Sequence, residues 1–204
     1  MNNKQAELVK QMTDKELIKH LYFSQFLFLM IGIVLAIFLF DGWSDFLSIW
    51  IINIYDIFII GSVVGISVVF IDLLLMKYVP KRLFDDGGIN EKMFQRRSVA
   101  HIILLTFLIA VAEEFLFRGV IQTHFGLLFA SILFALLHVR YLKVWLLLVS
   151  VVVLSFLLGY VYELTGSLYV TIWAHFIIDL LLALKIRRDY IKNKSNNNGG
   201  DSNG

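Results

Sequence analysis

Long apolar runs, separated by short polar segments, dominate this 204-residue chain. A helix needs roughly twenty apolar residues to cross a bilayer. The runs of about that length, one of them short, cover residues 21–40, 49–76, 99–122, 125–139, 142–162 and 167–185. A segment in lipid must satisfy its backbone hydrogen bonds internally, and no strand-like alternation is evident, so each run is predicted to be a helix. The pattern predicts an all-α fold, a polytopic membrane helix bundle with about six transmembrane helices.

The charges between these runs predict the orientation of the bundle. Lysine and arginine fall in alternate connections, at Lys4, Lys10, Lys15, Lys19, Lys77, Lys81, Arg82, Lys92, Arg96, Arg97, Arg140, Lys143, Lys185, Arg187, Arg188, Lys192 and Lys194. The intervening connections hold Asp41, Asp45, His124 and Glu163 without any lysine or arginine. Because basic loops stay in the cytoplasm, this alternation predicts a multi-pass protein of the cell membrane with both termini cytoplasmic.

Composition supports a membrane protein and excludes some chemistry. Hydrophobic residues make up 59% of the chain and charged residues 17%, whereas a soluble domain is closer to half apolar and a quarter charged. The net charge of +2 gives no indication of a nucleic-acid partner. The absence of cysteine excludes disulfides, thiolate catalysis and cysteine-ligated metals.

Polar segments divide the chain into four predicted parts. Residues 1–20 form a cytoplasmic segment, with a possible amphipathic helix marked by Leu8, Met12, Leu17, Ile18 and Leu21. Residues 21–97 form a two-helix membrane part that ends in a basic loop, and residues 98–185 form a four-helix core. Residues 186–204 form a cytoplasmic tail that we expect to be largely disordered from Asn193 onward. The lipid bilayer is the first partner that this organisation implies.

Two adjacent glutamates lie within one of the most apolar stretches of the chain. An ionised group inside the bilayer is costly, so Glu113 and Glu114 indicate a functional site facing the bundle interior. Glu114 and Arg118 are four residues apart and can pair on one face, while Glu113 is turned by about 100° from its neighbour. One carboxylate held by an arginine beside another that points elsewhere suits a general base with a supporting residue. A purely structural ion pair, with Glu113 facing a polar cavity, is the alternative.

Two other predicted helices carry ionisable groups in apolar surroundings. His138 is the last of four residues that recur every four positions on one face, after Gly126, Ala130 and Phe134. His175 and Asp179 are also four residues apart and share a helix face. Either histidine alone could be a packing or helix-tying residue. Three predicted helices each contribute ionisable residues. Separate structural roles for all of these residues are therefore a weak explanation. Serine-protease, aspartic-protease and HExxH signatures are not evident, which leaves a carboxylate and histidines that activate water directly or through a metal.

These residues resemble three motifs of one known family. EEFLFR (Glu113–Arg118) resembles the EExxxR motif of the CPBP family, also called Abi or type II CAAX prenyl endopeptidases. FALLH (Phe134–His138) resembles its FxxxH motif, and HFIID (His175–Asp179) resembles the histidine followed four residues later by Asn or Asp. The motifs occur in the family order, and the resemblance covers roughly residues 98–185.

The resemblance implies an intramembrane endopeptidase with an assigned role for each residue. Glu113 would activate water with help from His138, Glu114 and Arg118 would hold the glutamate helix, and His175 with Asp179 would stabilise the oxyanion. If the family mechanism uses a divalent metal such as zinc, the candidate ligands are His138, His175, Asp179 and Glu113; a glutamate mechanism needs no cofactor. An ionised aspartate cannot donate a hydrogen bond, so Asp179 favours ligation or orientation of the histidine.

The substrate implied is a membrane-associated protein or peptide, prenylated at a CAAX end by family association only. The alternatives are a non-catalytic membrane scaffold or regulator and a proton-coupled transporter. Gly61 and Gly65 predict close helix packing, or a face for a homo-oligomer. The depth of the residues raises a difficulty: Glu113 lies roughly 20 Å from Arg97 by helical rise, whereas His138 is close to Arg140. The two can meet only if a helix is tilted, broken or late to start, or if a water-filled cavity opens from the cytoplasm. We expect the water-filled cavity, because hydrolysis needs water at the site.

Overall fold

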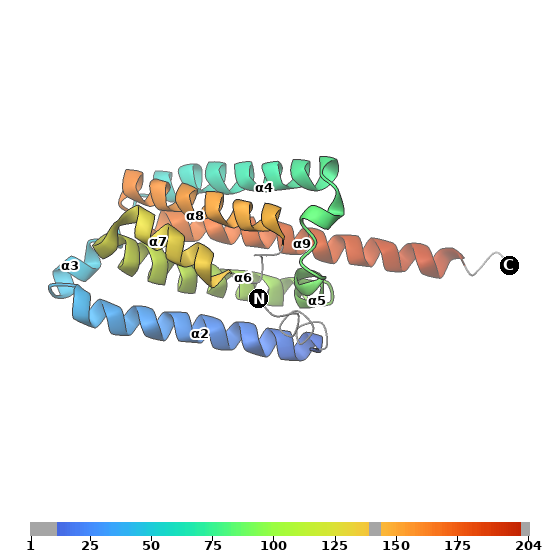
Figure 1. The fold of residues 1–204 in the computed structure, drawn as a ribbon, viewed down its shortest axis with the longest axis horizontal. Coiled ribbons are helices and arrows are strands. Elements are labelled where there is room, and N and C mark those ends of the chain that lie inside the picture. Colours follow the sequence, from blue (N-terminus) through green and yellow to red (C-terminus); the bar gives the residue numbers. More distant parts are fainter. Residues whose placement is uncertain (1–11, 139–143, 201–204) are drawn as a thin grey trace.

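A computed structural model describes residues 12–138 and 144–200, with side chains to residue 196. Within these ranges the chain folds into helices without any strand, which confirms the all-α polytopic bundle (Figure 1). The helices are α2 (Asp14–Leu39), α3 (Trp43–Leu47), η1 (Asp56–Ile60), α4 (Gly61–Tyr78), η2 (Lys81–Leu83), α5 (Ile89–Phe94), α6 (Val99–Glu114), η3 (Phe115–Gln122), α7 (Thr123–Leu137), α8 (Trp145–Thr165) and α9 (Leu168–Gly200). Of these, η1 and η3 are π-helical, and η2 is a 3₁₀ turn. Five residues of the sequence predictions lie outside the described residues: Lys4, Leu8, Lys10, Arg140 and Lys143.

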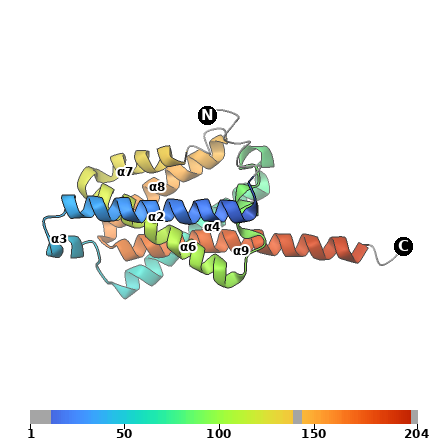
Figure 2. The same cartoon turned by 90° about the horizontal axis from the view of Figure 1, so that it is seen from below.

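The glutamate helix occupies the middle of the bundle. The continuous α6–η3 segment packs against α9, α2 covers one side of it, and α4 covers the far side of α9 (Figures 1 and 2). Helices α7 and α8 complete the bundle by packing on η3 and on each other. All eight residues of η3 are buried, as expected for a segment that is surrounded by other helices.

The count of spans differs in one place from the prediction of about six. Five helical segments in the described chain are long and apolar enough to cross a membrane, and one of them, Val99–Leu137, contains both the third and fourth predicted spans. Gly126 interrupts this segment, with φ of 82° and ψ of 165°. A residue with a side chain rarely adopts such a positive φ, whereas glycine adopts it without steric cost. The chain therefore reverses at Gly126, and α7 runs back along η3 as a helix of less than bilayer length.

Both ends of the predicted chain organisation shift in the structure. Helix α2 begins at Asp14, where Thr13 and Glu16 form a capping box, so the first span starts earlier than residue 21. Leu17 and Ile18 are buried against the loop helix α5 and do not form a separate surface helix. At the other end, α9 continues to Gly200, whereas disorder was expected from Asn193. Extending a formed helix costs little per residue, and pairs such as Lys185–Asp189, at 2.6 Å, support it.

The glycines of α4 mark a close helix contact, as predicted. A Cβ atom on Gly65 would lie 2.9 Å from the Ala174 carbonyl oxygen and 3.0 Å from Ile177 of α9, and Gly61 is similarly close to Trp173. Small residues allow two backbones to approach in a membrane, where no hydrophobic effect drives helices together. In this protein the face serves packing of α4 on α9 within one chain.

Replacing Gly65 by valine is therefore expected to push α4 away from α9. Overpacking of this kind costs about 1–3 kcal/mol. The Ile66→Val variant is the matched control, because Ile66 is the next residue and is 54% exposed. Thermal unfolding in detergent measures both variants, and equal stability of the two would show that the glycine contact is unimportant.

Candidate active site

The two glutamates end α6 at the point where the backbone changes to the π-helical η3. Segments of π-helix are rare and occur frequently at functional sites. Glu113 and Glu114 are the last two residues of α6, and Arg118 lies in the middle of η3. The carboxylates diverge as their angular offset predicts, because Glu113 contacts α2 whereas Glu114 contacts η3 and α9.

Glu114 is completely buried and holds two partners at once. Its Oε2 lies 3.3 Å from Nε of Arg118, so the predicted ion pair is present. Its Oε1 lies 3.0 Å from Nδ1 of His175, a contact that the sequence did not reveal. Glu114 therefore links the EExxxR motif directly to the histidine of the third motif.

Arg118 extends this network to two more helices. Its side chain is fully buried, and Nη2 donates to the Ser155 hydroxyl of α8 at 3.2 Å. Its guanidinium carbon lies 5.3 Å from the ring centre of Phe134 on α7, within the range of a cation–π interaction. A buried ion pair is tolerated only when further polar contacts compensate for lost hydration. Ser155 supplies a hydrogen bond, and the Phe134 ring adds a cation–π contact.

Glu113 contacts a residue that was not among the sequence predictions. The side-chain amide Nε2 of Gln25 donates to Oε1 of Glu113 at 3.3 Å. Gln25 lies on α2 and is 2% exposed, and Glu113 is 7% exposed. The polar residues of interest were all expected in the four-helix core, so this contact from the first span is a correction. The available signal was a lone amide within the apolar run YFSQFLFLMIG, since a polar group in hydrocarbon needs a partner.

The second motif owes its spacing to contacts within α7. His138 is the residue that ends the helix, and its Nδ1 lies 2.8 Å from the carbonyl oxygen of Phe134. A carbonyl oxygen can only accept, so Nδ1 carries the proton and Nε2 of the neutral ring bears the lone pair. The two rings also pack together, with their centres 4.5 Å apart. Phe134 thus contacts both His138 and Arg118.

The reversal at Gly126 resolves the depth difficulty that the sequence raised. Glu113 lies thirteen residues before Gly126, and His138 lies twelve residues after it. At helical rise these intervals correspond to about 20 Å and about 18 Å, so the two residues lie at similar depth. His138 is close to the basic residue Arg140 in sequence, yet α7 ends partway through the bundle. The reversal at Gly126 accounts for the similar depth, and the water-filled cavity open to the cytoplasm stays a prediction.

His175 and Asp179 lie on α9 beside the glutamates. Asp179 Oδ2 is 3.7 Å from His175 Nε2, which confirms the predicted shared face, although the distance is long for a hydrogen bond. Side-chain exposure rises from zero at Glu114 to 5% at His175 and 27% at Asp179. The network therefore opens toward Asp179 and is closed around Arg118.

A preformed metal centre does not fit the described residues. No group of three or more histidine and carboxylate side chains in residues 12–138 and 144–200 is arranged to hold a metal ion. A zinc site needs three or four ligands at about 2.0–2.3 Å. The predicted candidates Glu113, His138, His175 and Asp179 do not form such a set in the structure.

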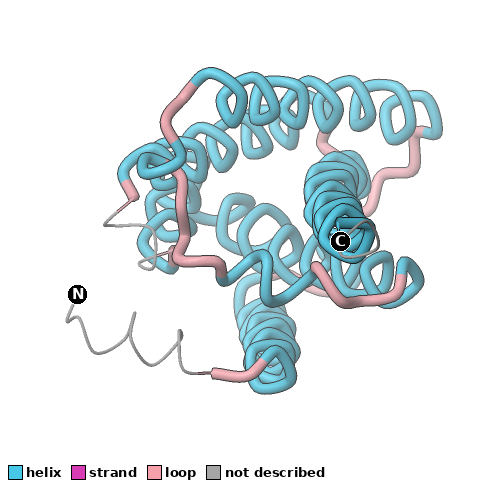
Figure 3. The backbone as a smooth tube through the Cα atoms, turned by 90° about the vertical axis from the view of Figure 1, so that its right-hand side faces the viewer, coloured by secondary structure: helices cyan, strands magenta, loops and turns pink. Residues whose placement is uncertain are grey.

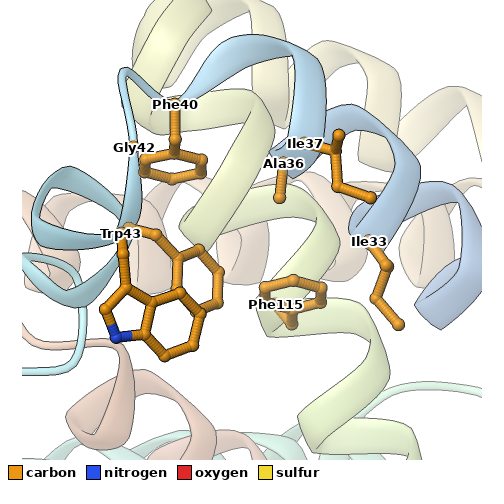
Figure 4. Close-up of a pocket in the computed structure, with 8 residues that line it drawn as sticks. Ile33, Ala36, Ile37, Phe40, Gly42, Trp43 and Phe115 are labelled. Carbon is orange, nitrogen blue, oxygen red and sulfur yellow. The ribbon is translucent and has the colours of Figure 1, made fainter.

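An apolar pocket lies beside the glutamate helix, between α2, α3 and the start of η3 (Figure 4). Its volume is about 260 Å³, slightly below the usual range for small-molecule sites. Phe115, the residue after Glu114, forms one wall. The other lining residues are Ile33, Ala36, Ile37, Phe40, Gly42, Trp43 and Phe46.

The bundle and its motif residues define a multi-pass membrane protein with the fold of a CAAX-type intramembrane protease. A family model described as type II CAAX prenyl endopeptidase Rce1-like matches residues 95–181. The chain is 47% identical over 169 residues to the uncharacterized protein YpbD of Bacillus subtilis (strain 168). The aligned region covers 83% of this chain and 89% of that protein. The chain therefore belongs to the Rce1-like family of type II CAAX prenyl endopeptidases. No solved structure matches it significantly.

Proposed function

We propose that this protein is an intramembrane endopeptidase that hydrolyses a peptide bond of a membrane-associated substrate. The observation that carries the proposal is the contact between Glu114, Arg118 and His175, next to Glu113. Buried ionisable residues in a membrane bundle mark functional sites by default. Membership of the Rce1-like family supports peptidase activity as the function of this site.

In the proposed mechanism Glu113 is the general base that accepts a proton from the attacking water. The amide of Gln25 orients its carboxylate by donating to Oε1. His138 assists through Nε2, the nitrogen that its bond to Phe134 leaves as an acceptor. After attack, the proton held by Glu113 passes to the leaving amine, which completes the hydrolysis.

Glu114 and Arg118 are proposed as positioning residues for His175. The Nδ1–H group of His175 donates to Glu114, whose other oxygen is held by Arg118. This arrangement fixes the plane of the imidazole and directs Nε2 toward Asp179. A protonated ring could donate from Nε2 to the oxyanion of the scissile carbonyl. Asp179 would balance the charge of that ring.

The substrate class is proposed from the family and from the apolar pocket. The description of the family names a CAAX prenyl endopeptidase, and the pocket offers an apolar surface at Phe115, the residue after Glu114. At about 260 Å³ it fits part of an apolar chain and not a whole lipid. We propose that the protein lies in the cell membrane with both termini in the cytoplasm, as the loop charges predict.

The experiment that tests this function uses purified full-length protein in lipid nanodiscs. A panel of membrane-tethered peptides, with and without a C-terminal prenyl group, is incubated with the protein, and fragments are identified by mass spectrometry. Cleavage that the His175→Ala variant loses is expected. A scaffold predicts no cleavage, and a proton-coupled transporter predicts pH-driven flux through the protein without fragments.

The same preparation tests the role of a metal. A glutamate mechanism predicts that activity survives exhaustive chelation, whereas a metal mechanism predicts that it is lost. Loss of activity with a chelator, and its return with added zinc, would contradict the glutamate mechanism. Elemental analysis of the active protein is the accompanying control.

A further inference from the structure

A groove rich in arginine lies at the end of the bundle from which α9 projects, the end that faces the viewer in Figure 3. It is separate from the glutamate network and has a volume of about 550 Å³. Arg96 and Arg97, which precede α6, form one side, and Arg187, Tyr190 and Lys194 of α9 form the other. No carboxylate is among the described residues that line it.

Backbone carbonyl groups hold the Arg97 and Arg187 side chains in this groove, and no acidic residue that lines the groove neutralises them. Arg187 Nε donates to the Arg97 backbone carbonyl at 2.8 Å. Arg97 in turn donates to the backbone carbonyls of Met93, at 3.2 Å, and Asp14, at 2.8 Å. Backbone carbonyls are dipoles and carry no net charge, so both guanidinium groups retain their positive charge toward the groove. The guanidinium of Arg96 lies 5.8 Å from the ring centre of Tyr190.

The acidic residue closest in sequence is already occupied. Asp189 pairs with Lys185 at 2.6 Å and with Arg188 at 3.6 Å, and neither of these basic residues lines the groove. The groove therefore presents four cationic side chains to one space. Arginine binds phosphate through two parallel hydrogen bonds, which makes a phosphate group the anion that such a cluster fits best.

The depth of the groove places it at the membrane surface. By helical rise Arg187 lies about 28 Å from the start of α9, close to the thickness of the hydrocarbon core. The apolar run of α9 ends at Leu184, and the cationic residues Lys185, Arg187 and Arg188 follow it. A groove at this level lies among lipid head groups. The basic end of the bundle is the predicted cytoplasmic end, and the cytoplasmic leaflet carries anionic lipids.

We propose that this groove binds the phosphate-bearing head group of an anionic phospholipid. Bound there, the lipid bridges the basic segment before α6 and the C-terminal extension of α9, which already contact each other through the Arg187–Arg97 bond and the Arg96–Tyr190 pair. The proposal does not depend on peptide hydrolysis, because no residue of the glutamate network takes part. Its ligand chemistry is a phosphate ester, and the membrane is its source.

Binding is measured on the full chain in a neutral detergent by the rise in unfolding temperature with added ligand. The ligands are short-chain phosphatidylglycerol, short-chain phosphatidylcholine and inorganic phosphate. Phosphatidylglycerol is expected to stabilise the protein at the lowest concentration. Stabilisation by inorganic phosphate at the same concentration would show that the groove takes a soluble anion, and would overturn the lipid assignment.

Three single substitutions test whether the groove is the site. Arg96→Gln and Arg187→Gln are each expected to weaken the apparent affinity for phosphatidylglycerol about fivefold. Arg188→Gln removes the same charge from the residue next to Arg187, outside the groove, and is expected to leave affinity unchanged. Arg187→Gln also loses a backbone contact, so Arg96→Gln, whose described contact is with the Tyr190 ring, decides the outcome if the other variant unfolds. Equal affinities of Arg96→Gln and Arg188→Gln would overturn the proposal.

Discussion

The Glu113→Gln variant is expected to lose peptide hydrolysis by a factor of roughly 10²–10⁴, the contribution typical of a general base. Glutamine has the shape of glutamate and can still accept a hydrogen bond from Gln25, so the fold should remain intact. Its amide cannot take a proton from water near neutral pH. The measurement is kcat/KM on a cleaved peptide, together with the unfolding temperature of each protein.

Glu163→Gln is the matched control for this substitution. Glu163 lies near the end of α8, where its Oε1 is 3.5 Å from the Gln122 amide, and it makes no described contact with the glutamate network. Its replacement is expected to leave kcat/KM within about twofold, as for a residue that contributes no catalytic proton transfer. Equal activity of wild type and Glu113→Gln would remove Glu113 from the mechanism.

The Arg118→Met variant is expected to be strongly destabilised, by about 3–5 kcal/mol, because it leaves the buried Glu114 carboxylate without its cation. Methionine fills much of the arginine stem, so the loss reflects charge more than volume. The free energy of unfolding in mixed detergent micelles gives the magnitude. No other single change in the described network is expected to cost as much.

A second substitution separates the ion pair from general damage to packing. Combining Arg118→Met with Glu114→Gln removes both charges and keeps a side chain that can accept from His175. The double variant is expected to recover a large part of the lost stability, because a neutralised pair needs no compensation. A loss of stability in the double variant that equals the sum of the losses in Arg118→Met and Glu114→Gln would show that Glu114 and Arg118 do not act as a buried pair.

Much of this site could be predicted from residue spacing within single helices. The pairing of Glu114 with Arg118 and of His175 with Asp179 follows from a separation of four residues, and the divergence of Glu113 follows from its angular offset. Such relations depend on helix geometry alone. Each is present in the structure.

Relations between helices could not be predicted in the same way. The bond from Gln25 to Glu113 and the bond from His175 to Glu114 depend on how α2 and α9 rotate against α6. Hydropathy sets the position of a span along the chain and does not set its rotation. The sequence placed the break between the third and fourth runs at residues 123–124, two residues before Gly126. It did not identify this glycine as the cause, because a glycine in an apolar run fits either a continuous or a broken helix.

The most direct test of the hydrolytic site is peptide cleavage by the purified protein in water enriched in ¹⁸O. Hydrolysis through an activated water places ¹⁸O in the new carboxyl terminus of the fragment, which mass spectrometry detects. The proposed hydrolytic mechanism predicts labelled product from the wild-type protein and none above background from Glu113→Gln or His175→Ala. Labelled product formed at the wild-type rate by both variants would contradict it.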